Sequence, residues 1–335
     1  MIPKIIAGLF AIPTAVFLLA ILPPKWRKRV VDVIAVGAIA VTVYYNTTKR
    51  PPPVEPSAFA AAVNLDAIGS IAVQADGRVK SFDSFARRMM RFVSGPYKIA
   101  GQDATFTYLD MMFRPEAYTN ADVIYVKKKQ IRRAIADRLA RVSAVDTSVL
   151  DTFQETGLIA PTLLFHPTVT SLLDEMEKDL IRTAKPVNAI RSALSVADAR
   201  TLSGSLRVIP PSGGSQADQW FLVDDLTGSA PSDAAHAGMA TSVNIPGLDP
   251  QLGDQLRQTW TNLSSAWKAQ DAQAVNDDLT RWAALLRGVE PTVYPNLDRM
   301  LLENWYFRWK SMTWIWLVYA AAVVPLLMSV IYHWP

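Results

Sequence analysis

The sequence predicts a mainly α-helical protein with a minor β element, in which three transmembrane helices hold one large extracytoplasmic domain. Apolar residues make up 50% of the 335 positions, and the mean hydropathy is positive, at +0.13. Both values favour segments that lie in lipid. Three long apolar runs are present, and most of the sequence between the second and the third run has the apolar spacing of helices.

The three apolar runs cover residues 5–22, 30–45 and 312–332. At about 1.5 Å of rise per residue, helices of such lengths cross the hydrocarbon core of a bilayer. The second run is short and includes Asp32, so a buried core helix is the alternative for it. The first run is expected to be retained, because residues 23–29 offer no cleavage site with small residues for a signal peptidase.

A basic loop between the first two runs predicts the orientation. It contains Lys25, Arg27, Lys28 and Arg29, and short loops rich in Lys and Arg stay in the cytoplasm. The chain is therefore expected in the inner membrane of a bacterium, with its main domain in the periplasm. The predicted organisation is a transmembrane hairpin with a cytoplasmic basic loop at residues 1–45, a Pro-rich spacer at 46–64, the extracytoplasmic domain at 65–311 and a C-terminal transmembrane helix at 312–335.

The charge of the outer domain argues against nucleic acid as a partner. The whole chain has a formal net charge of +4. Setting aside Lys4, the four basic loop residues and Asp32 from the 34 basic and 30 acidic residues leaves 29 of each sign. The excess positive charge is therefore a signal of membrane topology, and the outer domain lacks the basic balance of nucleic-acid-binding domains.

Apolar periodicity and turn residues predict the elements of the outer domain. A strand at 70–75 and a turn at 76–78 precede a helix at 81–93. Further helices are expected near 107–113, 126–142, 168–183, 186–200, 252–268 and 272–288, with two short strands at 206–209 and 220–223 and a polar linker at 227–242. Three tryptophans on the last two helices are expected to pack in the core: Trp260, Trp267 and Trp282.

The residues that could carry chemistry are few, and neither an enzyme nor a bound cofactor is expected. The absence of cysteine excludes thiol catalysis, Fe–S clusters, Cys-type zinc sites and covalent haem attachment through C-x-x-C-H. The chain has three histidines, His166, His236 and His333. For His166 a hydrogen-bonded structural imidazole is favoured over a metal or haem ligand, and for His333 a position at the membrane interface is favoured over a haem axial ligand.

Two groups of side chains are predicted to meet partners. The basic group is expected to dock an acidic protein such as a cytochrome, or anionic lipid headgroups, with a solvated helix face as the alternative. It comprises Lys127, Lys128, Lys129, Arg132, Arg133 and Arg138. The aromatic group is expected to form an interfacial belt and comprises Trp305, Tyr306, Trp309, Trp314 and Trp316. Small residues suited to helix packing in lipid are Gly8, Gly37 and Ala40.

Two stretches carry a resemblance to a known family. Residues 71–87, which include Gly77, Arg78, Lys80, Asp83 and Arg87, resemble the G-R-x-K-P-x-D-x-x-A-R motif that opens the extracytoplasmic domain of Ccs-type (system II) cytochrome c biogenesis proteins. In that family, a segment with acidic, aromatic, Asn and Arg residues leads into the next membrane span. Residues 294–308 resemble this segment. Ser81 stands where the family tends to have Pro. The Trp-rich haem-handling segment of the family has no counterpart in these 335 residues.

The resemblance implies a shared scaffold without the residues that handle haem. The expected function is therefore a non-catalytic, membrane-anchored accessory or scaffold subunit of a multi-subunit electron-transfer complex, respiratory or photosynthetic. The alternative is a cytochrome c maturation factor that works with a separate haem-handling partner. The expected partners are other membrane-protein subunits, with a cytochrome as one candidate, and the lipid bilayer.

Overall fold

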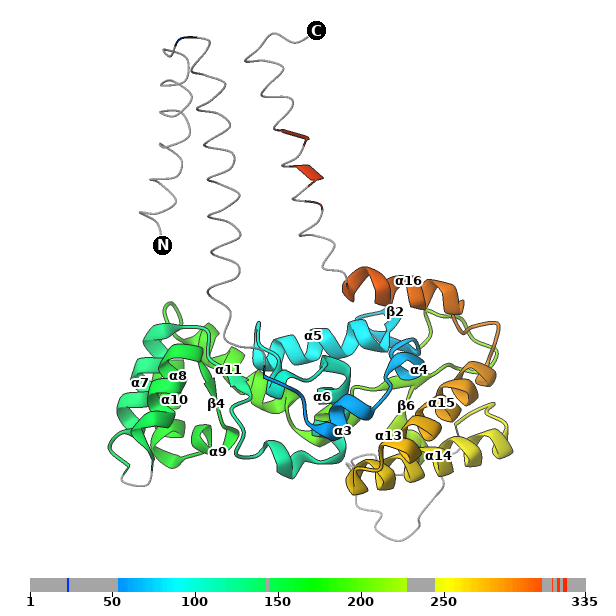
Figure 1. Cartoon of the computed structure of the whole chain (residues 1–335), viewed down its shortest axis with the longest axis horizontal. Coiled ribbons are helices and arrows are strands. Elements are labelled where there is room, and N and C mark those ends of the chain that lie inside the picture. Colours follow the sequence, from blue (N-terminus) through cyan, green and yellow to red (C-terminus); the bar gives the residue numbers. More distant parts are fainter. Residues whose placement is uncertain are drawn as a thin grey trace. The chain divides into compact units, whose positions relative to one another are not determined.

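A computed structural model describes residues 54–142, 145–227 and 245–308, together with the isolated positions 23, 315, 318, 319, 322 and 323. The chain divides into two compact units, Met1–Val54 and Glu55–Pro335. Nearly all described residues belong to the second unit. Figure 1 labels its helices and strands.

The second unit is mainly helical. Its longer helices are α5 (Phe82–Ser94), α6 (Ala104–Phe113), α7 (Lys129–Leu139), α8 (Thr147–Thr156), α10 (Pro167–Glu177), α11 (Ala184–Val196), α14 (Pro250–Ala269), α15 (Ala272–Val289) and α16 (Leu297–Arg308). Shorter helices are α3 (Ala58–Ala62), α4 (Asp66–Gly69), η1 (Ile99–Gly101), η2 (Pro115–Tyr118), α9 (Pro161–Leu164), α12 (Ala199–Ser203) and α13 (Val223–Thr227). The strands are β1 (Ala72–Ala75), β2 (Arg78–Ser81), β3 (Ile124–Tyr125), β4 (Leu158–Ile159), β5 (Arg207–Ile209) and β6 (Phe221–Leu222).

The minor β element consists of antiparallel two-stranded ladders. They pair β1 with β2, β3 with β4, and β5 with β6. The β3–β4 pair joins segments that lie on either side of α7 and α8, and helices α7, α8, α10 and α11 gather in one lobe around it (Figure 1). A two-stranded ladder is only marginally stable alone, so each of these ladders depends on the helices that cover it.

The predicted fold class needs a correction in its three transmembrane helices. Within the described ranges, no helix is both long enough and apolar enough to cross a bilayer. The longest described helices, α14 and α15, are amphipathic, with one buried face and one polar face. The segments on which the spans were predicted, 5–22, 30–45 and 312–332, lie outside the described residues apart from five isolated positions, and so do Gly8, Gly37 and Ala40.

An aromatic cluster forms the centre of the hydrophobic core. The Trp260 and Trp282 rings lie 4.6 Å apart, because α14 and α15 pack side by side (Figure 1). Trp267 lies 5.2 Å from Phe106 of α6, which brings α14 against the middle of the domain. All three tryptophans are buried, which confirms the predicted core role of Trp260, Trp267 and Trp282.

The folded domain begins inside the range predicted to be a spacer. Ser57 caps α3 by accepting a hydrogen bond from the Ala60 amide. Phe59 of α3 is buried, with its ring 5.5 Å from Phe106 and 5.6 Å from Trp267. Residues 55–64 therefore belong to the domain and contribute to its central aromatic cluster.

The hairpin β1–β2 turns on two residues with positive φ, Asp76 at 53° and Gly77 at 69°. Ala75 pairs with Arg78, so Asp76 and Gly77 form a two-residue loop of the type that matches strand twist. The chain then enters α5 directly, and the Ser81 hydroxyl caps that helix by accepting from the Ser84 amide at 3.3 Å. The predicted order of strand, turn and helix is confirmed here.

Replacing Gly77 with valine is expected to lower the free energy of unfolding by about 1–3 kcal/mol, because a β-branched residue strongly disfavours positive φ. No atom lies within 4 Å of the position that a Cβ would take at Gly77, so the loss would come from backbone strain. Urea titration measures it. Gly77→Asn is the matched control and should lose less, since asparagine tolerates left-handed backbone. Equal midpoints for Gly77→Val and the wild type would contradict the argument.

Candidate functional site

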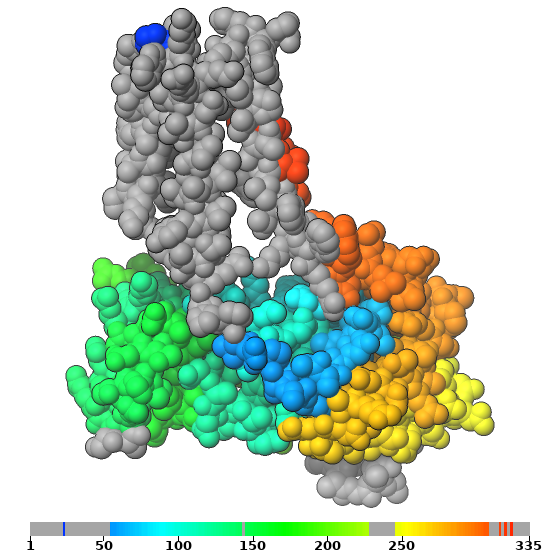
Figure 2. Space-filling model, viewed as in Figure 1, coloured from blue at the N-terminus to red at the C-terminus, as the bar shows by residue number. Residues whose placement is uncertain are grey.

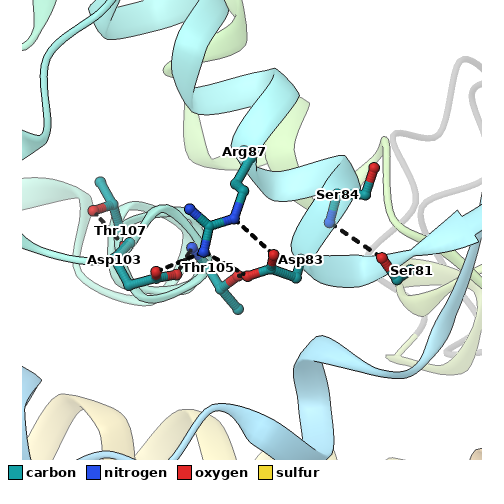
Figure 3. Close-up of polar contacts among 7 residues, drawn as sticks. All are labelled: Ser81, Asp83, Ser84, Arg87, Asp103, Thr105 and Thr107. Atoms are coloured by element: carbon teal, nitrogen blue, oxygen red, sulfur yellow. Dashed lines mark hydrogen bonds and ion pairs between the residues drawn. The ribbon is translucent and has the colours of Figure 1, made fainter. Parts of the chain in front are cut away.

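Residues 81–107 form an ion-pair and hydrogen-bond network at the start of α5 (Figure 3). Asp83 is buried, and Arg87 donates to both of its carboxylate oxygens, at 2.7 Å from Nε and 3.1 Å from Nη2. Arg87 Nη2 also donates to Asp103 Oδ2 at 2.9 Å, and the Thr105 hydroxyl donates to Asp83 Oδ1 at 2.9 Å. The network joins α5 to the first turn of α6.

These charges hold two helix ends together. Asp103 also caps α6, since its carboxylate accepts from the Thr105 amide at 2.9 Å. Burial alone would lower the pKa of Arg87, but hydrogen bonds and attraction from Asp83 and Asp103 raise it above its ordinary value. Asp83 and Arg87 of the motif therefore act as internal structural groups.

A second buried network centres on Asp110 of α6. Arg114 donates to both oxygens of this carboxylate, at 2.7 Å from Nε and 2.9 Å from Nη2. The Tyr118 hydroxyl donates at 2.6 Å, and Trp267 Nε1 donates at 2.8 Å. Burial and the neighbouring Asp110 carboxylate raise the pKa of Tyr118, so this phenol remains a donor at physiological pH. The carboxylate thereby connects α6, η2 and α14.

Residues 71–87 and 294–308 meet in the structure. The Ala72 amide of β1 donates to the Tyr294 hydroxyl oxygen at 2.8 Å, and α16 packs against β2 and α5. A small buried cluster lies at this junction and consists of Ala72, Trp220, Val293 and Met300. Burial in the cluster raises the pKa of Tyr294 to about 12.

A groove runs beside α16. It has a volume of about 880 Å³ and lies between the end of α5, the loop that follows it, the start of α6 and the end of α16. Its lining includes the cationic residues Arg91 and Lys98 and the aromatic residues Tyr306 and Phe307. Arg87 and Gln102 also reach the groove, although both bond inward to other side chains. The groove therefore combines an aromatic wall with a cationic rim.

Helix α16 exposes a group of large apolar side chains, which we call the α16 surface. Its members are Leu301, Leu302, Trp305, Tyr306 and Phe307. Leu302 is 64% exposed and Phe307 is 51% exposed, whereas Met300 faces the core. In Figure 2, α16 is orange and forms part of the outer surface in that view. Of the predicted aromatic belt, Trp305 and Tyr306 lie here, and Trp309, Trp314 and Trp316 lie outside the described residues.

Sequence reasoning missed the leucines and Phe307 of the α16 surface, although a signal was present. Apolar residues occupy positions 300–302 and 305–307, so they fall on all sides of one helix. A helix that packs by a single face cannot bury apolar side chains on all of its sides. Part of its apolar surface must therefore remain exposed or meet a partner.

Five of the six residues of the predicted basic group are exposed. Lys127, Lys128, Lys129, Arg133 and Arg138 are exposed at the start and on the outer side of α7. Two of these have internal partners, because Lys128 Nζ donates to the Arg182 carbonyl at 2.5 Å and Arg138 lies 3.7 Å from Glu175.

Arg132 is the exception and needs a correction. It is only 5% exposed, and its guanidinium lies 5.3 Å from the centre of the Tyr125 ring. It donates to the Val126 carbonyl and, at 3.4 Å each, to the carbonyls of Gln154 and Glu155 at the end of α8. Arg132 therefore joins α7, β3 and α8 from inside and is not available to a docking partner.

No described side chains suggest a metal centre. The described residues contain no group of three or more His, Asp or Glu side chains that could hold a metal ion. His166 caps α10, where its Nδ1 accepts from the Thr168 amide at 3.3 Å, in keeping with the favoured structural role. His236 and His333 lie outside the described residues.

Comparisons with protein-family models and with curated proteins found no match. The resemblance to Ccs-type proteins therefore stays a prediction that rests on residues 71–87 and 294–308.

Asp110→Ala is expected to lower the free energy of unfolding by about 3–5 kcal/mol, because Arg114 would lose its buried counter-charge. Trp267 Nε1 would also be left without an acceptor. Tyr118→Phe removes one donor and keeps the ion pair, so it should lose only about 1.5 kcal/mol. Chemical denaturation monitored by tryptophan fluorescence measures both. A smaller loss for Asp110→Ala than for Tyr118→Phe would show that the carboxylate is dispensable.

Arg132→Ala is expected to lower the free energy of unfolding by about 2–4 kcal/mol, since the backbone carbonyls it serves would lose their donor. Arg133→Ala, at the exposed neighbouring position, is the matched control and should change stability by less than about 0.5 kcal/mol. Thermal denaturation of both variants measures the difference. Equal melting temperatures for the two variants would mean that Arg132 does not stabilise the packing of α7, β3 and α8.

Proposed function

We propose that this protein is a non-catalytic accessory or scaffold subunit of a multi-subunit electron-transfer complex at the inner membrane of a bacterium. In this proposal, the described domain lies on the periplasmic side and binds another subunit through the α16 surface. The observation that carries the proposal is the exposure of Leu301, Leu302, Trp305, Tyr306 and Phe307 on one helix. Large exposed apolar surfaces mark interaction sites.

The chemistry of the α16 surface supports a protein partner. The centres of protein interfaces are enriched in aromatic residues and arginine, and their rims are polar. Tyr306 and Phe307 lie beside the groove, whose rim carries Arg91 and Lys98. Complete burial of one large apolar side chain contributes about 1.5–3 kcal/mol, so a few of these residues could anchor a subunit.

The choice of an electron-transfer complex rests on the resemblance to cytochrome c biogenesis proteins. The junction of residues 71–87 with residues 294–308, through the Ala72–Tyr294 hydrogen bond, supports treating the two stretches as one unit. In this reading, the chain kept the scaffold of that family and uses it to hold a neighbouring subunit.

The same junction favours one alternative, a cytochrome c maturation factor that works with a separate haem-handling partner. The α16 surface would then bind that partner. The two proposals differ in what the cell loses with the gene. Loss of an accessory subunit loosens a complex whose cytochromes are still made, whereas loss of a maturation factor lowers all c-type cytochromes that depend on it.

A double substitution on α16, Leu302→Ser with Phe307→Ser, is expected to reduce co-purification of partner subunits at least tenfold, as the loss of two apolar anchors predicts. The tagged chain is isolated from native membranes in mild detergent, and the partners are identified by mass spectrometry. The haem content of the c-type cytochromes should stay at the wild-type level, which separates this proposal from the maturation alternative.

Matched control variants keep this test specific to α16. Val149→Ser on α8 and Phe165→Ser after α9 also replace exposed apolar residues, and both should retain every partner. The melting temperature of the α16 variant should match the wild type, because both of its side chains are more than half exposed. Full retention of partners by the α16 variant would overturn the proposed docking surface.

A further inference from the structure

The loop between α10 and α11, residues 178–183, holds two large aliphatic side chains in water. Leu180 is 83% exposed and Ile181 is 95% exposed. Among the described residues, no other large apolar side chain is as exposed as these two. They are adjacent in sequence, so they form one apolar tip, which we call the α10–α11 tip.

Hydrogen bonds fix the backbone that presents this tip. Asp179 Oδ1 accepts from the amides of Ile181 and Arg182, at 3.2 and 3.0 Å. The Asp179 carbonyl accepts from Thr183 and Ala184, at 3.1 and 2.9 Å. The loop is therefore ordered with its apolar residues outward, and binding would not have to supply the ordering entropy.

The surroundings of the tip are positively charged. Three exposed cationic residues flank it along the chain: Lys178, Arg182 and Lys185. Lys128 reaches this loop from another part of the chain, because its Nζ donates to the Arg182 carbonyl at 2.5 Å. It brings the neighbouring cations at the start of α7, Lys127 and Lys129, to the same side of the lobe.

The acidic residues near the tip already have partners. On α10, Asp174 pairs with Arg191, and Glu177 lies 3.2 Å from the same guanidinium. Glu175 lies 3.7 Å from Arg138, and Asp179 binds the loop backbone. These four acids are outnumbered by the cations around them, so the local charge stays positive. The cations are Lys127, Lys128, Lys129, Arg138, Lys178, Arg182, Lys185 and Arg191.

We propose that the α10–α11 tip inserts into the surface of a bilayer that contains anionic phospholipids, with Leu180 and Ile181 entering the acyl boundary and the flanking cations binding headgroup phosphates. Shallow insertion of apolar residues combined with attraction to anionic lipid is how interfacial elements bind membranes. The inference rests on the proposed position of the chain at a membrane.

A bilayer fits this tip better than a protein partner does. The centres of protein interfaces are depleted in lysine and rich in aromatic residues, whereas the tip has two aliphatic residues, with Lys178 and Lys185 on either side. Aliphatic side chains enter a bilayer without a complementary pocket. The α16 surface differs in that it also has aromatic residues, two of which lie beside a groove.

The chain contains no cysteine, so a single introduced cysteine reports on one position of the full-length protein. Ile181→Cys carries an environment-sensitive NBD fluorophore, and the labelled chain is reconstituted with protein-free vesicles of phosphatidylcholine, with or without phosphatidylglycerol. In anionic vesicles, the probe emission should shift to shorter wavelength, and nitroxide-labelled lipids should quench it. Ala269→Cys, at the exposed end of α14, is the control and should remain accessible to aqueous iodide.

Two further variants separate the apolar and the electrostatic contributions. Leu180→Ser, in the labelled background, should lower the ratio of lipid-inserted to water-exposed probe at least tenfold. Replacement of Lys178, Arg182 and Lys185 by glutamine should cause a loss of similar size in anionic vesicles and little change in neutral ones.

An iodide-accessible probe at position 181 in both kinds of vesicle would overturn the proposal. The proposal would also be overturned if the probe were protected from iodide only in native membranes and subunits co-purified with the chain. That result would assign the tip to a protein partner. Protein-free vesicles contain no other subunit. The outcome is therefore independent of the co-purification test of α16, and either proposal can fail alone.

Discussion

The buried carboxylate of Asp110 is the interaction on which the arrangement of the domain depends. Three side chains donate to it: Arg114, which directly follows α6, Tyr118 of η2 and Trp267 of α14. A buried charge without such partners is strongly unfavourable, so α14 must lie where Trp267 can reach Asp110. The hydrogen bond therefore selects one position of α14 among the many that apolar packing alone would permit.

The position of α14 in turn determines the positions of the β1–β2 hairpin and of α16. Because α15 packs along α14, it places Arg287 where Nη2 donates at 2.9 Å to the hydroxyl of Ser70, two residues before β1. The chain leaving α15 brings the Tyr294 hydroxyl to the Ala72 amide, and α16 follows against β2 and α5. The buried side of α16 therefore fixes the position of the helix, and its exposed side chains are not needed for that.

How much the sequence could predict depended on how local the determinants were. The strand, turn and helix at residues 70–93 were predictable, because the Asp76–Gly77 turn and the Ser81 cap are signals within a few residues. Helices α14 and α15 were predictable from apolar periodicity alone. The predicted helix at 168–183 was too long, since α10 ends at Glu177 and Asp179 then binds the turn that follows. Strands β3 and β4 have two residues each and pair across α7 and α8, so no local pattern reveals them.

The candidate sites were only partly predictable for the same reason. Arg132 and Arg133 are adjacent, and a count of charge treats them alike. Helical spacing distinguishes them, because Arg132 shares a face with Ile135, Ala136 and Leu139, all of which are buried. The groove beside α16 is lined by residues about 200 positions apart in sequence, from Arg91 to Phe307. No local sequence pattern indicates that such distant residues lie together in the folded chain.

The interior and the surface of this domain use charge and apolar area in opposite ways. Inside, Asp83 with Arg87 and Asp110 with Arg114 neutralise each other through paired hydrogen bonds, so these charges stabilise the fold. Outside, the α10–α11 tip and the α16 surface leave apolar side chains in water, which costs free energy in the isolated chain. The domain retains its fold because the internal networks do not depend on these side chains. An exposed surface that does not serve folding is free to serve binding, and its composition then indicates the partner: lysines around aliphatic residues suit a bilayer, and aromatic residues beside a groove suit a protein.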